Sequence, residues 1–316
     1  MNTRTITITG GSGFVGRLLR EGLGQRGYTI RVYDRWRGLL VDCLRRRYLG
    51  RCQGREAHAL ANYLRRGMRL SERLSVRARL LRESGDDVLE PRSRLVDRFR
   101  GSRAVIHLAA LPHPFVPGMT AADFRRINYE GSINVFEAAC EAGVPRFIFA
   151  SSGQVYGINN PVKVEQFPIL ETNYCPTLAE GQTHYGLLKR ELECYLENAC
   201  RGSTQTQAVS FRLEYPGTRS LTPRNFYIST SCENLVAGFE AAIERELSTG
   251  SEVLNLVDRE VDARVADIQE FLKTRWPEVP NYTTGNECLL STAKASAVLG
   301  YDPRPGGTYF WESVMW

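Results

Sequence analysis

Long apolar runs are missing from this chain of 316 residues. No stretch reaches the roughly eighteen apolar residues that a membrane-spanning helix needs. The N-terminus enters a strand-like segment directly, without a signal-peptide pattern. These absences predict a soluble, cytoplasmic protein with no membrane partner.

Cysteine and lysine are equally uninformative as site markers. The eight cysteines are scattered, with no Cys-x-x-Cys pair and no Cys/His cluster at zinc spacing, so we expect reduced thiols and no metal. Only four lysines accompany 37 arginines, which we interpret first as a coding bias. The net charge of +6 is therefore poor evidence for a nucleic-acid partner, and we expect none.

The arginines are unevenly placed. Fourteen of them lie between Arg35 and Arg82 against three acidic residues, a local balance of about +11. Leucines at helical spacing predict an inserted helical segment over about 36–84. Its arginines are either solvated or form an anion-binding or assembly surface.

A glycine-rich turn near the N-terminus organises the rest of the chain. A β-branched strand runs into it, and an amphipathic helix follows. Glycines recur there at every third residue, as Gly10, Gly13 and Gly16. This spacing allows a tight turn, the approach of a pyrophosphate to the helix N-terminus, and close packing of helix on strand. A second strand over 29–33 ends in Asp34, whose carboxylate can accept both hydroxyls of an adenosine ribose.

Strand and helix patterns alternate along most of the chain. Strands are predicted at 85–89, 104–108, 146–150, 208–213 and 253–257, and helices at 91–100, 121–142, 184–199, 233–247, 266–271 and 292–299. We therefore expect an α/β fold, a Rossmann-type doubly wound parallel sheet over 1–212. A small C-terminal α/β substrate-binding part should occupy 213–316.

Three residues suggest proton transfer to an alcohol. Tyr185 and Lys189 are four residues apart and share a helix face. A lysine ammonium there stabilises a tyrosine phenolate, so the phenol can exchange a proton near neutral pH. Ser152 follows a predicted strand at the sheet edge where ligands bind, and it can donate a hydrogen bond to the substrate oxygen. Hydride would then pass between the substrate carbon and a nicotinamide.

Five ordered motifs together resemble the extended short-chain dehydrogenase/reductases, the family of nucleotide-sugar epimerases and dehydratases. The motifs are Thr9 to Gly16, Val105 to Ala110, Ser151-Ser152, Tyr185-x-x-x-Lys189 and Ser291 to Pro303. The resemblance implies catalytic roles for Ser152, Tyr185 and Lys189, an NAD cofactor, and a homodimer formed through helices at about 121–142 and 183–200. The cofactor contacts that it implies are Gly10, Gly13, Phe14, Val15, Gly16, Asp34, Arg35, Asp87, Val88, Leu108, Ala109, Ala110, Asn128, Tyr185, Lys189 and Tyr215.

Departures from the family pattern bear on cofactor and substrate. Asp34 favours NAD because a carboxylate repels a 2′-phosphate, although Arg35 and Arg37 leave room for NADP. Gly153 and Gln154 stand where the related dehydratases carry an Asp-Glu pair, so dehydration is disfavoured. Tyr215 replaces a family asparagine and the segment after it is short, which speaks against an enclosed nucleotide diphosphate.

The predicted function is that of an NAD-dependent epimerase-like enzyme, which acts on a hydroxyl of a sugar or sugar-nucleotide-like substrate through a keto intermediate. The alternatives are a net dehydrogenase or ketone reductase on a smaller, non-nucleotide substrate, and a cofactor-binding scaffold. Candidate substrate residues are His113, Ser151, Gln154 and Arg224. His113 has either a structural or a proton-transfer role. Arg45, Arg46 and Arg47 would help to hold an anionic substrate or the cofactor pyrophosphate.

Overall fold

A computed structural model describes residues 4–34, 87–111, 120–157, 164–173, 184–201 and 205–312. Several of the predictions fall outside these residues. They are the inserted segment 36–84 with Arg45, Arg46 and Arg47, the cofactor residue Arg35, and the substrate residue His113.

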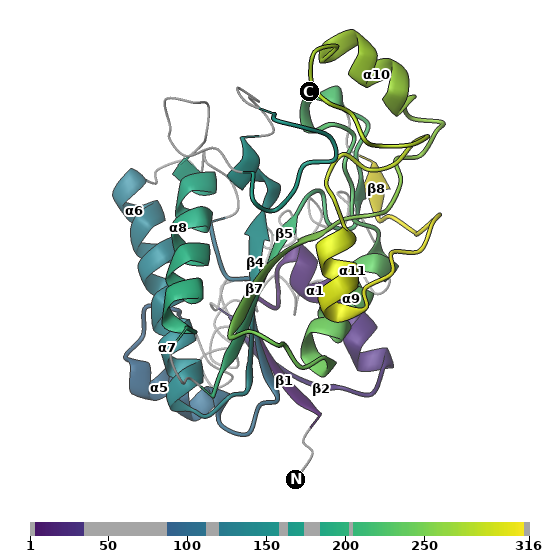
Figure 1. Ribbon diagram of the computed structural model, residues 1–316. Coiled ribbons are helices and arrows are strands. Elements are labelled where there is room, and N and C mark those ends of the chain that lie inside the picture. Colours follow the sequence, from purple (N-terminus) through teal and green to yellow (C-terminus); the bar gives the residue numbers. More distant parts are fainter. Residues whose placement is uncertain are drawn as a thin grey trace, which may run out of the picture.

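Six parallel strands form the central sheet, in the order β2-β1-β3-β4-β5-β7 (Figure 1). Their bounds are β1 Thr5–Thr9, β2 Thr29–Tyr33, β3 Ala104–His107, β4 Arg146–Ser152, β5 Gln207–Leu213 and β7 Ser251–Leu256. The inner strands are almost continuously buried, as expected for a sheet covered on both faces. The strand order reverses between β1 and β3, so a ligand crevice is expected at the carboxyl ends of these strands. The predicted Rossmann-type sheet is confirmed.

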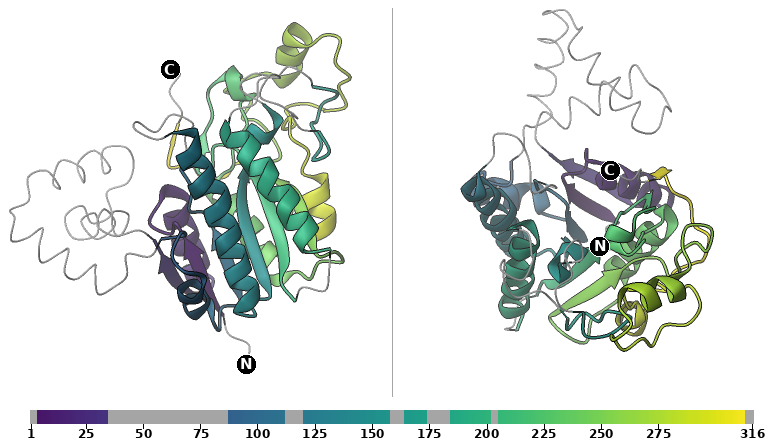
Figure 2. Two further views of the ribbon diagram at one scale, coloured as in Figure 1. Left: turned by 90° about the vertical axis from the view of Figure 1, so that its left-hand side faces the viewer. Right: turned by 90° about the horizontal axis from the view of Figure 1, so that it is seen from above.

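Helices cover both faces of the sheet (Figure 1). One face carries α5 (Arg92–Phe99), α6 (Ala121–Arg125), α7 (Gly131–Glu141) and α8 (His184–Ala199). The other carries α1 (Phe14–Gln25), α9 (Cys232–Glu244) and α11 (Ala293–Leu299). The predicted helix over 121–142 is continuous, but a π-helical turn at Arg126–Glu130 joins α6 to α7. Figure 2 shows this long helix beside α8.

The strand predicted at 85–89 is wrong for the residues that are described. Asp87 to Glu90 form a turn. The Asp87 carboxylate accepts from the Leu89 amide at 3.1 Å, a local bond that competes with strand pairing. The Asn134 amide, from α7, donates to the carbonyls of Val88 and Glu90 at 2.9 Å each. Side chains therefore satisfy backbone groups that a strand would have given to a neighbour.

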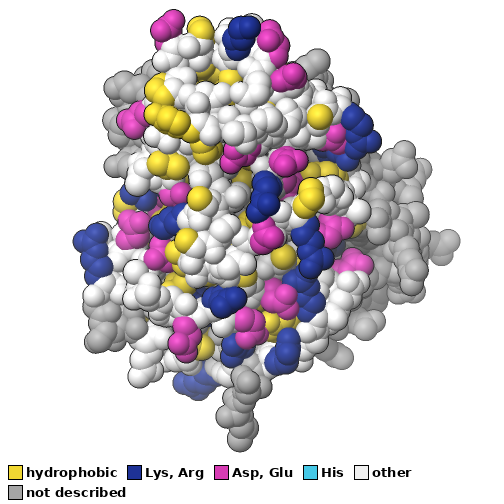
Figure 3. Space-filling model, turned by 45° about the vertical axis from the view of Figure 1, so that its right-hand side comes forward, with side chains coloured by type: hydrophobic (Ala, Val, Ile, Leu, Met, Phe, Trp, Pro, Cys, Tyr) yellow, Lys and Arg dark blue, Asp and Glu magenta, His cyan; other side chains and the backbone are white. Residues whose placement is uncertain are grey.

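Part of the chain after β5 builds a smaller lobe above the carboxyl edge of the sheet, whereas β7, α9 and α11 return to the sheet itself. The lobe contains α10 (Ile268–Arg275) and a parallel pair formed by β6 (Thr218–Arg219) and β8 (Trp311–Glu312). An apolar cluster that includes Phe226, Ile228 and Ile268 forms its core. None of the described helices is long and apolar enough to cross a membrane. On the face shown in Figure 3, basic and acidic side chains are interspersed rather than gathered by sign.

Candidate active site

Close contacts explain the glycines of the turn after β1. Gly10 has a φ of +70°, and a Cβ added to it would lie 2.7 Å from the Ala109 nitrogen. A Cβ at Gly16 would lie 2.6 Å from the Gly10 oxygen. Only glycine lets the turn lie against the end of β3 and lets α1 lie against the turn.

The same turn has the features of a dinucleotide site. Helix α1 begins after Gly13 without a side-chain cap, so its first N–H groups face outward from the helix end. The Asp34 carboxylate, just after β2, accepts from the Ser12 amide at 2.8 Å. Within the described part of the chain, the buried Ser12 hydroxyl has no partner. These groups fit a pyrophosphate at Gly13, Phe14 and Val15 and a ribose at Asp34.

The other predicted cofactor residues surround the end of β3. Leu108, Ala109 and Ala110 are partly exposed there. Asp87 and Val88 lie in the turn after the inserted segment, and the Tyr33 hydroxyl donates to the Asp87 carbonyl at 3.0 Å.

Asn128, also predicted to contact the cofactor, is buried in the π-helical turn. Its amide accepts from the Leu111 nitrogen at 2.7 Å and donates to the Leu111 oxygen at 3.1 Å. In this structure the Asn128 side chain therefore holds the backbone of Leu111, in the segment after β3.

A buried histidine supports this edge of the sheet from within. The His107 ring lies 2.7 Å from both the Thr9 and the Ser132 hydroxyls. Burial, assisted by the charge of Lys189, lowers the pKa of His107 to about 3, so the imidazole stays neutral. Its partners satisfy both ring nitrogens, which makes it a structural link between β1, β3 and α7.

The predicted catalytic residues lie around the carboxyl end of β4. Ser152 is the last residue of that strand, and its hydroxyl accepts from the Gln154 amide nitrogen at 3.2 Å. Tyr185 and Lys189 lie on the first turns of α8, with the lysine Nζ 5.4 Å from the tyrosine ring centroid. A Cβ at Gly186 would lie 2.4 Å from the Gln154 oxygen. Helix α8 therefore begins directly against the turn that follows Ser152.

Burial controls the ionisation of this group. Lys189 is 4% exposed, donates to the Ala150 carbonyl at 2.6 Å and lies 4.4 Å above the Phe149 ring. Burial lowers its pKa to about 7, against a smaller opposing effect of Glu193. Burial also raises the pKa of Tyr185, and the charge of Glu214 adds to that shift. The phenol is therefore protonated at neutral pH in this structure.

Adjacent serines at the end of β4 have different surroundings. The Ser151 hydroxyl donates to the Glu193 carboxylate at 2.5 Å. Glu193 also forms a fully buried ion pair with Arg212 at 2.7 Å. Ser151 thus belongs to a buried ionic cluster between α8 and β5, and a substrate contact by it stays a prediction.

Sequence reasoning missed one residue of the site, Glu214. It follows β5 immediately, is buried, and is hydrogen-bonded by the Gln154 and Asn225 side chains. Burial raises its pKa to about 8. The signal that could have found it is a carboxylate directly after a buried parallel strand, at the edge where ligands bind.

Two further predicted residues lie beyond Glu214. Tyr215 is partly exposed and has a φ of +41°, an unusual conformation for a tyrosine. Arg224 is exposed in a short 3₁₀ turn, and its charge acts on Tyr215.

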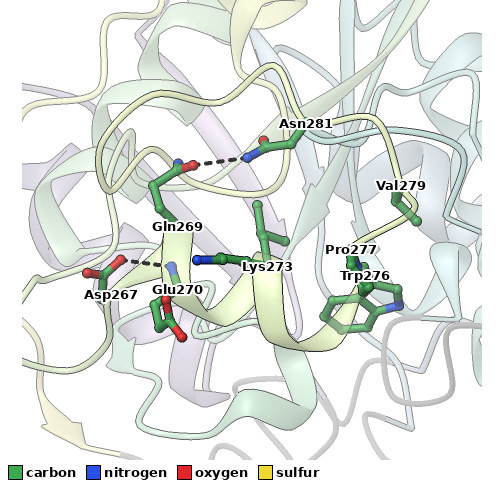
Figure 4. A pocket seen from close by; sticks show the side chains of 9 residues that line it. Asp267, Gln269, Glu270, Lys273, Trp276, Pro277, Val279 and Asn281 are labelled. Carbon is green, nitrogen blue, oxygen red and sulfur yellow. Dashed lines mark hydrogen bonds between the residues drawn. The ribbon is translucent and has the colours of Figure 1, made fainter.

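A separate hollow of about 450 Å³ lies on the C-terminal lobe (Figure 4). It is lined by α10 and the segment that follows, and Trp276 forms one of its walls. Two of its polar side chains are hydrogen-bonded to each other, Asn281 donating to Gln269 at 3.0 Å, and the Asp267 side chain caps α10. None of its residues belongs to the Ser152–Tyr185–Lys189 set.

Comparison with known proteins agrees with the family that the motifs resemble. The model of the NAD dependent epimerase/dehydratase family matches residues 71–230. The chain is 27% identical over 215 residues to a UDP-glucose 4-epimerase of Erwinia amylovora, covering 67% of this chain and 53% of that protein. It is 25% identical over 271 residues to the 3beta-hydroxysteroid-dehydrogenase/decarboxylase isoform 1 of Arabidopsis thaliana, covering 79% and 54%. The chain thus spans about half the length of the curated relatives it matches.

Among solved structures, MoeE5 in complex with UDP-glucose and NAD is similar with a TM-score of 0.60. The sequence identity is 19%, and the match covers 96% of this chain and 94% of that one. At this identity the likeness establishes the fold.

Proposed function

The chain belongs to the NAD dependent epimerase/dehydratase family, as its ordered motifs predicted, and we propose that it is an epimerase-like enzyme that transiently oxidises a hydroxyl of a sugar or sugar-nucleotide-like substrate. The observation that carries this proposal is that the start of α8, with Tyr185 and Lys189, packs against the carboxyl end of β4, where Ser152 is the last residue. NAD, bound along the Gly10–Gly16 turn and Asp34, would accept the hydride and return it.

The residues of the chain handle the proton. The Ser152 hydroxyl already accepts from the Gln154 nitrogen, so its own hydrogen is available to the substrate oxygen. Tyr185 removes the hydroxyl proton as hydride leaves the carbon, and it returns the proton when the ketone is reduced. Lys189 stabilises the phenolate electrostatically from one helical turn away. Because burial raises the pKa of Tyr185, the oxidative half-reaction should accelerate as pH rises.

The substrate and cofactor preferences are part of the same proposal. Asp34 selects NAD over NADP because its carboxylate opposes a 2′-phosphate. A nucleotide sugar is the leading substrate class, by analogy with the UDP-glucose 4-epimerase relative. Dimerisation through the helices at about 121–142 and 183–200 and a cytoplasmic location remain expectations.

A second candidate is a net dehydrogenase on a smaller substrate. The connection between Gly217 and Asn225 is short, with only β6 and a single 3₁₀ turn, which speaks against an enclosed nucleotide diphosphate and favours a smaller substrate. The similarity to a steroid dehydrogenase/decarboxylase also favours it. Absorbance at 340 nm with NAD separates the two. Interconversion of UDP-sugars without net NADH supports the epimerase. Stoichiometric NADH from a smaller alcohol supports the dehydrogenase, and NAD binding without turnover of either overturns both in favour of a scaffold.

The control is Tyr185→Phe, which keeps the ring and removes the acid–base group. Turnover should fall by about 10²–10⁴-fold while NAD still binds. Unchanged turnover in this variant would remove Tyr185 from the reaction.

A further inference from the structure

Glu214 is a buried carboxyl that the reaction above does not use. Only 5% of it is exposed, at the carboxyl end of β5 and beside the proposed reaction centre. Its side chain is held by two neutral amides, those of Gln154 and Asn225. Asn225 is itself buried and fixed, because its amide accepts from Ser220 at 2.6 Å and donates to the Ile228 carbonyl at 3.2 Å. Burying a carboxyl among fixed side chains costs free energy, so its presence at this position calls for a functional explanation.

Gly153 makes the room for this carboxyl. A Cβ added at Gly153 would lie 2.5 Å from both Cγ and Oε1 of Glu214. A side chain at 153 and the carboxyl of Glu214 therefore compete for one space. Gly153 directly follows Ser152, so the carboxyl of Glu214, at the end of β5, occupies a space next to Ser152 that a larger residue at position 153 would fill.

The carboxyl also acts on the proposed proton donor. Glu214 is the charged residue that raises the pKa of Tyr185 beyond the effect of burial. From α8, Tyr185 is the titratable residue on which Glu214 acts, with Lys189 5.4 Å from the Tyr185 ring centroid, and from the segment of Glu214 itself, Tyr215 lies beside it with Arg224 beyond. The close approach of Gly186 to Gln154 fixes α8 against the same turn that Glu214 holds.

We propose that Glu214 is a positioning residue of this site, a third ionisable group that fills the space above Gly153, fixes Gln154 and acts electrostatically on Tyr185. The inference rests on the proposed function, since it assumes that Tyr185 handles the reacting proton. The two charges near Tyr185 then have opposite effects. The Lys189 ammonium stabilises the Tyr185 phenolate, whereas the Glu214 carboxylate destabilises it.

The sign of the effect follows from the charges. Below about pH 8 the Glu214 carboxyl is protonated and neutral, and above it the carboxylate disfavours loss of the Tyr185 proton. Glu214→Gln keeps the size and removes the charge. It should move the pH–rate limb that belongs to Tyr185 to lower pH by about one unit, a shift that a purely structural role would not produce.

An experiment without turnover tests the coupling directly. The protein, labelled with ¹³C at Tyr Cζ and Glu Cδ, is titrated by NMR, with Tyr185→Phe and Glu214→Gln used for assignment. In the wild type, the Glu214 carboxyl should titrate near pH 8, and the Tyr185 signal should show a step at the same midpoint. Glu214→Gln should lose that step. A Glu214 signal that titrates near the ordinary value of about 4.3, or a Tyr185 signal without the shared step, would overturn the proposal.

Two variants complete the design. Glu214→Asp restores a carboxylate and should restore the Tyr185 step. Glu171→Gln removes a partly buried carboxyl, whose charge acts on Tyr156, and should leave the Tyr185 step in place. If Glu214→Gln does not fold, the coincident midpoints in the wild type still decide the question. A shared step in a protein that turns over no substrate would refute the proposed function and retain the coupling.

Discussion

Lys189→Met should stabilise the folded protein while it abolishes turnover. The ammonium of Lys189 is buried with one carbonyl partner, and its pKa falls from 10.5 to about 7. At about 1.4 kcal/mol per unit, keeping that charge in the folded state at pH 7 costs on the order of 4 kcal/mol. Methionine fills the same volume without charge but leaves the Ala150 carbonyl unpaired, a loss of about 1–2 kcal/mol. A net gain on the order of 2 kcal/mol is expected.

The gain depends on pH with a definite sign. Because the pKa of Lys189 is lower in the folded than in the unfolded protein, the unfolded chain binds more protons between about pH 7 and 10.5. Wild-type stability therefore rises through that window, and the Lys189→Met variant lacks this contribution. Its advantage should be largest at pH 7 and below, and it should disappear toward pH 10.5.

Urea unfolding at pH 6.5, 8.0 and 9.5 measures the effect as a difference between variant and wild type, so that other titrating groups cancel. Lys273→Met, on the exposed side of α10, is the matched control and should show no gain at any pH. If Lys189→Met destabilises the protein equally at pH 6.5 and 9.5, the ammonium is not under a burial penalty. The electrostatic description of the site would then be wrong.

Three further predictions concern the frame of the site. Asp34→Ala should weaken NAD binding more than NADP binding in fluorescence titrations, because only NAD keeps the ribose hydroxyl that the carboxylate accepts; an equal loss would contradict this role. Gly16→Ala should lower the free energy of unfolding by about 1–3 kcal/mol, whereas Gly24→Ala on the same helix, with nothing within 4 Å, should raise it by about 0.5–1 kcal/mol. Glu193→Gln leaves the Arg212 charge buried and unpaired, so urea unfolding should show a loss of about 3–5 kcal/mol; a loss below 1 kcal/mol would show that the pair is solvated.

The fold could be predicted where a single local pattern decides the structure. Glycine spacing and a β-branched run place the turn between β1 and α1, and helical periodicity predicts α8 over the same residues as the structure, His184–Ala199. The strand at 85–89 could not be rejected, because Asp87 and Asn134 capture its backbone through side chains that a strand pattern does not register. The π-helical turn was equally invisible, since its extra residue leaves the apolar spacing on both sides intact.

The catalytic set and Glu214 differ in predictability for a physical reason. Tyr185 and Lys189 lie on one helix, so their spacing alone sets their geometry. Glu214 acquires its environment from three other segments: Gly153 after β4, Tyr185 on α8 and Asn225 in a 3₁₀ turn. No spacing in the sequence relates these positions, because the parallel register of β4 with β5 is what places Leu213, and hence the residue after it, beside Ser152. At Gly153 the sequence has no side chain where the related dehydratases carry a carboxylate, and the space left there holds the carboxyl of Glu214 from the end of the neighbouring strand. Whether this site contains a carboxylate therefore has to be determined from the register of β4 with β5, and not from the residues after Ser152 alone.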